Sequence, residues 1–173
     1  MALHLIIDGY NLIKNSPSLS ALDRQDLQLG REALIDLLAD YKKVKSHKIT
    51  VVFDGAGALD IKLSRERIKG IHVVFSRHGQ TADAVIKNMA SREREKALIV
   101  SSDRDIVVFA MSHGAAVVSS LHFEEKIAQA APAADDGFPA LDAKSWNPST
   151  KKKGPGRRLS KRERKNKIKT RKL

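Results

Sequence analysis

The sequence contains no cysteine, few aromatic residues and no long hydrophobic run. None of its 173 residues is Cys, and only 5% are Phe, Trp or Tyr. The absence of cysteine excludes disulfides, zinc–thiolate sites and cysteine nucleophiles, and it suits a reducing cytosol. No segment reaches the roughly 18 apolar residues of a membrane span, and Asp8 interrupts the apolar N-terminal run, which has no basic residue before it. We therefore expect a cytoplasmic protein without membrane association.

Several motifs of known enzyme classes are also missing. Gly55 and Gly57 fit neither GxxxxGK[ST] nor GxGxxG, so we expect no nucleotide cofactor. The six histidines show no metal-ligand spacing, and no Ser/His/Asp arrangement of a hydrolase can be recognised. We expect the hydroxyls of Ser101 and Ser102 to hold Asp103 or a phosphate, together with the amides of the following helix.

Positive charge is concentrated in one segment. Of the 32 Lys and Arg residues, 13 lie in residues 151–173 beside a single acid, Glu163, whereas the rest of the chain holds 19 residues of each sign. A neutral domain with a polycationic tail is typical of proteins that bind nucleic acid. The tail has no aromatic residue to stack on bases, so we expect contacts to RNA phosphates alone. The candidate contacts are Lys151, Lys152, Lys153, Arg157, Arg158, Lys161, Arg162, Arg164 and Lys165.

Short β-branched segments alternate with amphipathic ones, which predicts an α/β fold. We expect strands at residues 3–7, 49–53, 71–75, 97–100 and 115–118, and helices at residues 31–44, 81–91, 105–111 and 123–130. This order favours a three-layer sandwich around a mostly parallel sheet of about five strands. Residues 15–29 and 56–69 are interpreted as loops, the first with a helical turn. The expected division is a domain at 1–130, a linker at 131–150 and a basic, disordered tail at 151–173, of which 157–169 could become helical on RNA.

Five acidic residues follow the predicted strands, where a parallel sheet binds its ligands. They are Asp8, Asp54, Asp83, Asp103 and Asp105. Each alone is explained as a turn former or helix N-cap, and Asp54 is closest to that explanation. Together, however, such carboxylates repel one another unless a cation lies among them. Oxygen ligands without His or Cys favour one or two Mg²⁺ or Mn²⁺ ions, which activate water for phosphodiester hydrolysis.

Four of these segments carry a family resemblance. DGYNLI (residues 8–13), VVFDG (51–55), TADAVI (81–86) and SSDRDI (101–106) resemble the signature blocks of the YacP-like NYN domain, a branch of the PIN-like nucleases, over roughly residues 3–125. The resemblance implies a PIN-like, Rossmannoid fold and metal-dependent RNA cleavage. It implies that Asp8, Asp83 and Asp103 are metal ligands and that Asn11 orients a ligand or contacts a phosphate.

The same resemblance bears on the remaining candidates. Asp105 stands at a position that is acidic in many PIN nucleases, so we count it as a fourth catalytic and metal-binding candidate. Arg77 and Arg104 flank acidic blocks and could grip the scissile strand. Family members from bacilli are similar to ribosome-dependent mRNA decay endonucleases, which makes mRNA, and with it the ribosome, the expected partner.

The sequence thus predicts a metal-dependent endoribonuclease that leaves 5′-phosphate and 3′-hydroxyl ends. A different class remains open, namely a non-catalytic RNA- or ribosome-binding protein on a PIN-like scaffold. That alternative accounts for the basic tail but leaves the clustered carboxylates unexplained. A third candidate, a toxin-like nuclease of tRNA or rRNA, shares the chemistry and differs in its target. Metal dependence separates the first reading from the second.

Overall fold

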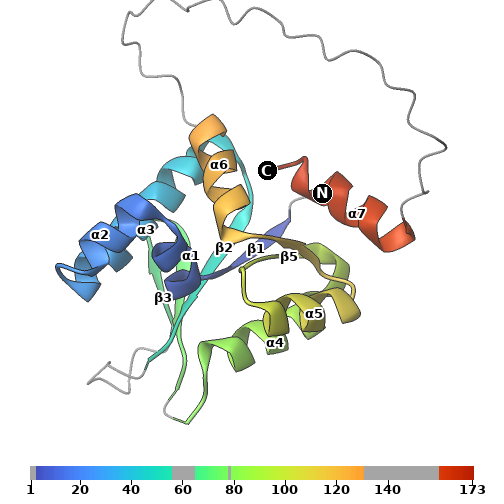
Figure 1. The fold of residues 1–173 in the computed structure, drawn as a ribbon, viewed down its shortest axis with the longest axis horizontal. Coiled ribbons are helices and arrows are strands. Elements are labelled where there is room, and N and C mark those ends of the chain that lie inside the picture. Colours follow the sequence, from blue (N-terminus) through green and yellow to red (C-terminus); the bar gives the residue numbers. More distant parts are fainter. Residues whose placement is uncertain (1–2, 56–64, 78, 131–159) are drawn as a thin grey trace, which may run out of the picture.

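A computed structural model describes residues 3–55, 65–77, 79–130 and 160–173 (Figure 1). In chain order the described part contains β1 (His4–Asp8), α1 (Gly9–Asn15), α2 (Pro17–Asp23), α3 (Leu27–Val44), β2 (Lys48–Phe53), β3 (Arg65–Ile68), β4 (Ile71–Phe75), α4 (Ala82–Glu93), a 3₁₀ turn (Arg94–Lys96), β5 (Ala97–Val100), α5 (Arg104–Ser112), β6 (Ala116–Val118), α6 (Ser120–Ala130) and α7 (Lys161–Thr170).

The six strands form one sheet in the order β3-β4-β2-β1-β5-β6. All neighbouring strands are parallel except β3 and β4. Every residue of β1 is buried, as expected of a central parallel strand covered on both faces. The chain leaves β1 toward β2 on one side and returns to β5 on the other. The point between β1 and β5 is therefore the switch point of the topology, where α/β sheets bind ligands.

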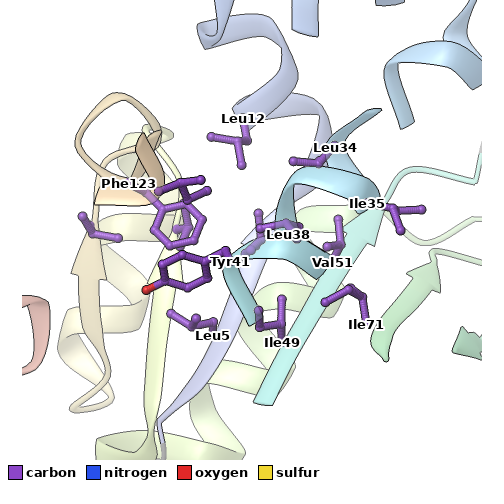
Figure 2. Packing of buried hydrophobic residues seen from close by; sticks show 14 of the residues in the cluster. Leu5, Leu12, Leu34, Ile35, Leu38, Tyr41, Ile49, Val51, Ile71 and Phe123 are labelled. Carbon is purple, nitrogen blue, oxygen red and sulfur yellow. The ribbon is translucent and has the colours of Figure 1, made fainter. Parts of the chain in front are cut away.

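Helices cover both faces of the sheet and make it the middle of three layers, which confirms the predicted fold class. Helices α1, α3 and α6 contact one another on one face, and α4 and α5 lie together on the other. Figure 2 shows the larger core, in which Tyr41 and Phe123 meet edge to face with ring centroids 5.7 Å apart. Among the described residues, no helix is long and apolar enough to cross a membrane.

A glycine allows α1 to begin directly after β1. A Cβ atom at Gly9 would lie 2.4 Å from Cε1 of Phe53, which is closer than real Cβ contacts come. Gly9 therefore lets the first turn of α1 pass against the end of β2. Asp8 is the N-cap of this helix, so the last strand residue also fixes the first helical turn.

The predicted loop at residues 15–29 is wrong, because most of this segment is helical. Ser16 is the N-cap of α2, its hydroxyl accepts a hydrogen bond from the Leu19 amide, and Pro17 takes the first helical position. Proline at that position loses no intrahelical hydrogen bond and has the φ of a helix. Helix α3 also begins four residues before the predicted start, at a cap formed by Asp26.

The predicted loop at residues 56–69 is wrong for its second half, and the sheet has six strands rather than about five. Residues 65–68 form β3, which pairs antiparallel with β4 across Lys69 and Gly70. Both turn residues have positive φ, 49° and 81°, as a two-residue type I′ hairpin requires. Residues 56–64 lie outside the described residues.

Residues 160–173, which belong to the tail predicted to be disordered, contain helix α7 in the structure. Ser160 and Glu163 form a capping box at the start of α7, and this satisfies two backbone amides of the first turn. The helix packs on strand β6 at the edge of the sheet, and it is the red helix of Figure 1. Leu173 is buried in the larger core, where its carbonyl oxygen accepts a hydrogen bond of 3.1 Å from the Tyr41 hydroxyl. The predicted linker and residues 151–159 lie outside the described residues.

Candidate active site

Asp8 lies at the centre of the predicted site, at the carboxyl end of β1. Its Oδ1 accepts a hydrogen bond of 3.2 Å from the Asn11 amide, and its Oδ2 accepts one of 3.2 Å from the Ser101 hydroxyl. The residue is only 8% exposed, and this burial is the main cause that raises the pKa of its carboxyl above the usual value. Repulsion from Asp83 and Asp103 raises the pKa further, while the two hydrogen bonds oppose the shift.

Asn11 links three strand ends through its side-chain oxygen. Its Oδ1 accepts hydrogen bonds from the Ser102 amide, at 2.9 Å, and from the Ser120 hydroxyl, at 2.7 Å. Ser102 follows β5 and Ser120 follows β6, whereas Asn11 itself follows β1. The amide oxygen of Asn11 thus braces the frame of the site, and the residue acts on the carboxylates by holding the loops that carry them.

Asp103 is the N-cap of α5, at the carboxyl end of β5. Its Oδ1 accepts hydrogen bonds from the amides of Asp105, at 2.8 Å, and Ile106, at 3.2 Å. The fully buried Ser101 hydroxyl joins this residue to Asp8, because it accepts from the Asp103 amide at 3.1 Å and donates to Asp8. The predicted role of Ser101 in holding Asp103 is confirmed at the Asp103 backbone, so one hydroxyl joins the Asp8 carboxylate to the main chain that carries the Asp103 carboxylate.

Asp83 reaches the same edge from helix α4. It lies in the first turn of that helix, behind the N-cap Thr81, and is half-buried. The charges of Asp83 and Asp103 both raise the pKa of Asp8, so the three carboxylates lie within electrostatic reach of one another. The structure therefore brings Asp8, Asp83 and Asp103 together around the switch point between β1 and β5.

Lys87 is a member of this site that the sequence analysis missed. Its ammonium group forms an ion pair with Asp105, whose side chain is 79% exposed. The hydrogen bond that Lys87 donates to Asp105 raises the pKa of Lys87, and the charges of Asp105, Asp83 and Asp103 add to that effect. Lys87 follows Asp83 by four residues, and this spacing places two side chains on one face of a helix. That spacing was the signal available in the sequence.

Other predicted residues lie around this centre rather than in it. Asp54 accepts a hydrogen bond of 3.1 Å from the Ser76 hydroxyl, which in turn accepts one of 2.9 Å from the Gly55 amide. Asp54 thus helps to fix the turn after β2, in agreement with the sequence analysis, in which it was the acid best explained as a turn former. Arg104 begins α5, and Arg77 follows β4; both are exposed.

The basic tail residues divide between those described and those outside. Lys161, Arg162, Arg164 and Lys165 are exposed on α7, and Lys165 forms an ion pair of 2.6 Å with Glu95. Lys151, Lys152, Lys153, Arg157 and Arg158 lie outside the described residues. The cations on α7 are therefore held in a helix against the sheet edge, beside the β5–β6 side of the molecule.

The acidic centre has the donor chemistry of a hard-cation site without its closed geometry. Asp8, Asp83 and Asp103 supply carboxylate oxygens, and the repulsion that raises the pKa of Asp8 is what a divalent cation would relieve. Within residues 3–55, 65–77, 79–130 and 160–173, however, no group of three or more His, Cys, Asp or Glu side chains is arranged so that it could hold a metal ion. Oxygen donors and charge fit such an ion; the spacing of the carboxylates would have to close around it.

Comparison with known proteins connects this centre to a family. The model of the YacP-like NYN domain matches residues 5–172. A curated relative, the uncharacterized protein YacP of Bacillus subtilis, is 32% identical over 88 residues, which is 50% of this chain and 50% of that protein. The chain thus matches about half the length of this curated relative.

Two solved structures share the fold. The crystal structure of Rae1 (YacP) from Bacillus subtilis superposes with a TM-score of 0.62 and 24% identity, covering 75% of each chain. A mutant of the same protein gives a TM-score of 0.61 and 23% identity, covering 74% of this chain and 76% of that one. The family model extends through α7 as well as the sheet and supports a nuclease or RNA-related role. The chain belongs to the YacP-like NYN domain family.

Proposed function

We propose that the protein is a metal-dependent endoribonuclease that hydrolyses phosphodiester bonds of RNA. The observation that carries this proposal is the convergence of Asp8, Asp83 and Asp103 at the switch point of the sheet, with Asp8 buried and repelled by the other two. A purely structural role does not account for a buried carboxylate whose charge two neighbouring carboxylates disfavour. Such perturbed groups at a ligand-binding edge are typical of functional sites.

The proposed cofactor is Mg²⁺ or Mn²⁺, as one or two ions. Asp8, Asp83 and Asp103 would hold it, with the exposed Asp105 as a fourth candidate. When bound, such an ion lowers the pKa of a water molecule and offsets charge on the phosphate. The chain contributes the frame: Ser101 keeps Asp8 and Asp103 side by side, and Asn11 keeps the two loops in place.

The proposed substrate is RNA, with mRNA first and rRNA or tRNA as other targets. Arg77 follows β4 and Arg104 begins α5, both at the carboxyl edge of the sheet. The exposed cations of α7 are a second candidate for phosphate contacts, near the opposite edge, where Lys165 pairs with Glu95 before β5. These contacts would recognise phosphates rather than bases. Action on mRNA at the ribosome, in the cytoplasm, belongs to the proposal as well; the family resemblance is its support.

Cleavage of end-labelled single-stranded RNA tests the proposal. We expect cleavage with Mn²⁺, none with EDTA, and a loss of about 10³-fold or more in Asp8→Asn, because several kcal/mol of charge stabilisation would be removed. Asp40→Asn is the matched control, since Asp40 is exposed on α3 and pairs with Lys43. Equal cleavage by Asp8→Asn and Asp40→Asn would contradict the proposal.

Asp105→Asn measures how much the fourth carboxylate contributes to the cleavage rate. Because Asp105 is exposed and paired with Lys87, we expect its loss to slow cleavage less than about tenfold, as for a surface ion pair worth about 1 kcal/mol or less. A loss as large as that of Asp8→Asn would place Asp105 among the principal ligands. RNA binding without cleavage at any metal concentration, even on ribosome-presented mRNA, would favour the non-catalytic binding protein.

A further inference from the structure

A groove of about 270 Å³ lies beside the acidic centre, between α4 and the β3–β4 hairpin. Helix α4 packs over β1, β2 and β5, so it leaves the hairpin strands on that face uncovered along its flank. The groove takes its lining from β3, from β4 and the loop after it, and from one side of α4. The lining residues are Arg65, Val74, Phe75, Arg77, Gln80, Val85, Asn88, Met89 and Arg92.

Three arginines from three different elements converge on this groove. Arg65 comes from β3, Arg77 from the loop after β4, and Arg92 from the last turn of α4. All three are exposed, and in the described part of the chain none of them forms an ion pair. Among the described residues that line the groove, none is acidic. Three guanidinium groups without counter-charges make this a site for an anion.

The charge of this groove differs from that of the larger hollow on the other face of the sheet. That hollow also contains cations, but its Lys43 and Lys69 are paired with Asp40 and Asp36. Two of its four cations, which also include Lys42 and Arg67, are thus neutralised within the protein. The arginine groove keeps its charge available to a ligand, and Gln80 and Asn88 add uncharged hydrogen-bonding groups.

The floor of the groove is apolar. Val74, Val85 and Met89 are half-buried, and Arg65 is the direct cross-strand partner of Val74, so their side chains lie on one face of the hairpin. Arginines around a floor of small apolar side chains match a nucleotide, whose phosphate is charged and whose base is flat and largely apolar on its faces. A groove for a free inorganic anion alone would not require this floor.

The groove and the acidic centre lie on opposite flanks of α4. The groove residues Val85, Met89 and Arg92 repeat at helical spacing on one flank, whereas Asp83 lies on the other flank together with Lys87, which pairs with Asp105 on α5. Gln80 lines the groove just before the first turn of α4, and that turn carries Asp83, so the two sites approach each other at the start of the helix. A strand held at Asp83 would reach the groove by crossing this first turn.

We propose that this groove binds the single-stranded RNA segment next to the scissile phosphate, through Arg65, Arg77 and Arg92. The proposal takes its ligand class from the proposed function, and the groove adds a second point at which the strand is held. Arg77 belongs to both, since it follows β4 at the carboxyl edge of the sheet and also lines the groove. Arg65 and Arg92 have no other role in the proposed site.

Binding in the absence of cleavage tests the groove separately from the nuclease. Fluorescence anisotropy of a labelled oligouridylate is measured in EDTA with the Asp8→Asn protein, and then with Arg65→Gln and Arg92→Gln added together. We expect affinity to fall about tenfold at 0.1 M salt. The slope of log affinity against log salt should become shallower by about 1.4, since each of the two lost phosphate contacts on a single strand contributes about 0.7.

Arg24→Gln in the same background is the matched control, because Arg24 is exposed at the end of α2, a helix on the other face of the sheet. It should change neither affinity nor slope. Unchanged binding in the double variant, with a melting temperature equal to that of its parent, would overturn the groove, as would an equal loss in Arg24→Gln. Cleavage by wild-type protein is scored independently, so a groove that fails and a nuclease that fails give different results.

Discussion

Two asparagine side chains tie distant segments of this protein together, and they do so with opposite consequences. Asn11 accepts hydrogen bonds from the Ser102 amide and the Ser120 hydroxyl, and thereby holds two loops of the acidic centre. Asn166 on α7 accepts from the Val117 amide at 2.7 Å and donates to the Val117 carbonyl oxygen at 3.1 Å. The Asn11 side chain stabilises the loops that carry like-charged carboxylates. The Asn166 side chain stabilises the contact between α7 and the backbone of β6, which is called the neutral seam below.

The difference shows which part of the molecule is built for stability and which for chemistry. At β6 the Asn166 amide supplies the donor and acceptor that an edge strand lacks, and Lys165 reaches the carboxylate of Glu95. At the acidic centre the carboxylates of Asp83 and Asp103 repel that of Asp8, and hydrogen bonds from the Asn11 amide and the Ser101 hydroxyl hold Asp8 in place against that repulsion. Proteins keep such unfavourable arrangements where a ligand or a reaction needs them.

Asn11→Ala would break the frame of the acidic centre and should have the largest effect. The Ser102 amide and Ser120 hydroxyl lose their acceptor, which should lower the free energy of unfolding by about 1–3 kcal/mol. Cleavage should fall about 10- to 100-fold, as when the support of a metal ligand is removed. Chemical unfolding and cleavage of end-labelled RNA measure the two effects.

Gln28→Ala is the control for that variant, because Gln28 is an exposed amide side chain on α3 and donates to the exposed Glu32. It should leave cleavage within about twofold of wild type. If Asn11→Ala behaved like Gln28→Ala, the Asn11 side chain would have no part in holding the carboxylates.

Asn166→Ala would break the neutral seam. We expect about 1–2 kcal/mol lower stability, because the Val117 amide and carbonyl at the sheet edge lose their partners. Hydrogen exchange at the Val117 amide should accelerate, while the metal-dependent cleavage rate on short RNA stays near that of wild type. Lys167→Ala, one position along on the exposed side of α7, should change neither. If Asn166→Ala lost cleavage and Lys167→Ala did not, the contact between α7 and β6 would be needed for activity as well as for stability.

The smallest expected effect is on how the free energy of unfolding depends on pH, because the pKa of Asp8 in the acidic centre is raised by its surroundings. Because the folded pKa of Asp8 is raised, the folded state binds more protons than the unfolded state between the two pKa values. Stability from this group is therefore lost as pH rises from the usual Asp value of 3.8 through the raised folded pKa. Asp8→Asn removes that loss, so its stability relative to wild type should increase over this window and then level off.

Asp40→Asn should show the opposite sign, since the hydrogen bond from Lys43 lowers the pKa of Asp40. Wild type gains stability from that group as pH rises through the lowered folded pKa toward 3.8, and the variant does not. Urea unfolding at a series of pH values measures both differences. Curves of the same sign for the two variants would show that Asp8 is not strained by its neighbours.

The strands and the longer helices were predictable because their local pattern agrees with their final environment. Buried parallel strands such as β1 and β2 have runs of β-branched residues, and α3 has an apolar face at helical spacing. Helix α2 was missed because Ser16 and Pro17 form a start signal that lies inside a polar segment. Strand β3 was missed because its exposed arginines alternate with half-buried residues and it is a strand only through pairing with β4.

The residues of the site also divide into those that the sequence predicted and those that depend on tertiary contacts. The acids that follow strands could be placed at one edge from the order of the elements, and the spacing of the family blocks pointed to the same residues. Lys87 was missed because its meeting with Asp105 depends on how α4 packs beside α5. The arginine groove was missed for a similar reason: only the β3–β4 pairing brings Arg65 opposite the flank of α4.

The sequence by itself determined the fold class, the strand-end position of Asp8 and Asp103, and the excess of positive charge in residues 151–173. These depend on hydrophobic periodicity and composition, which act over a few residues at a time. Only the tertiary structure decided that α7 closes the sheet edge through Asn166, that Asp54 belongs to a turn, and that three arginines meet in one groove. Those outcomes depend on which surfaces far apart in the chain come into contact, and packing selects those contacts among many that local pattern leaves equal.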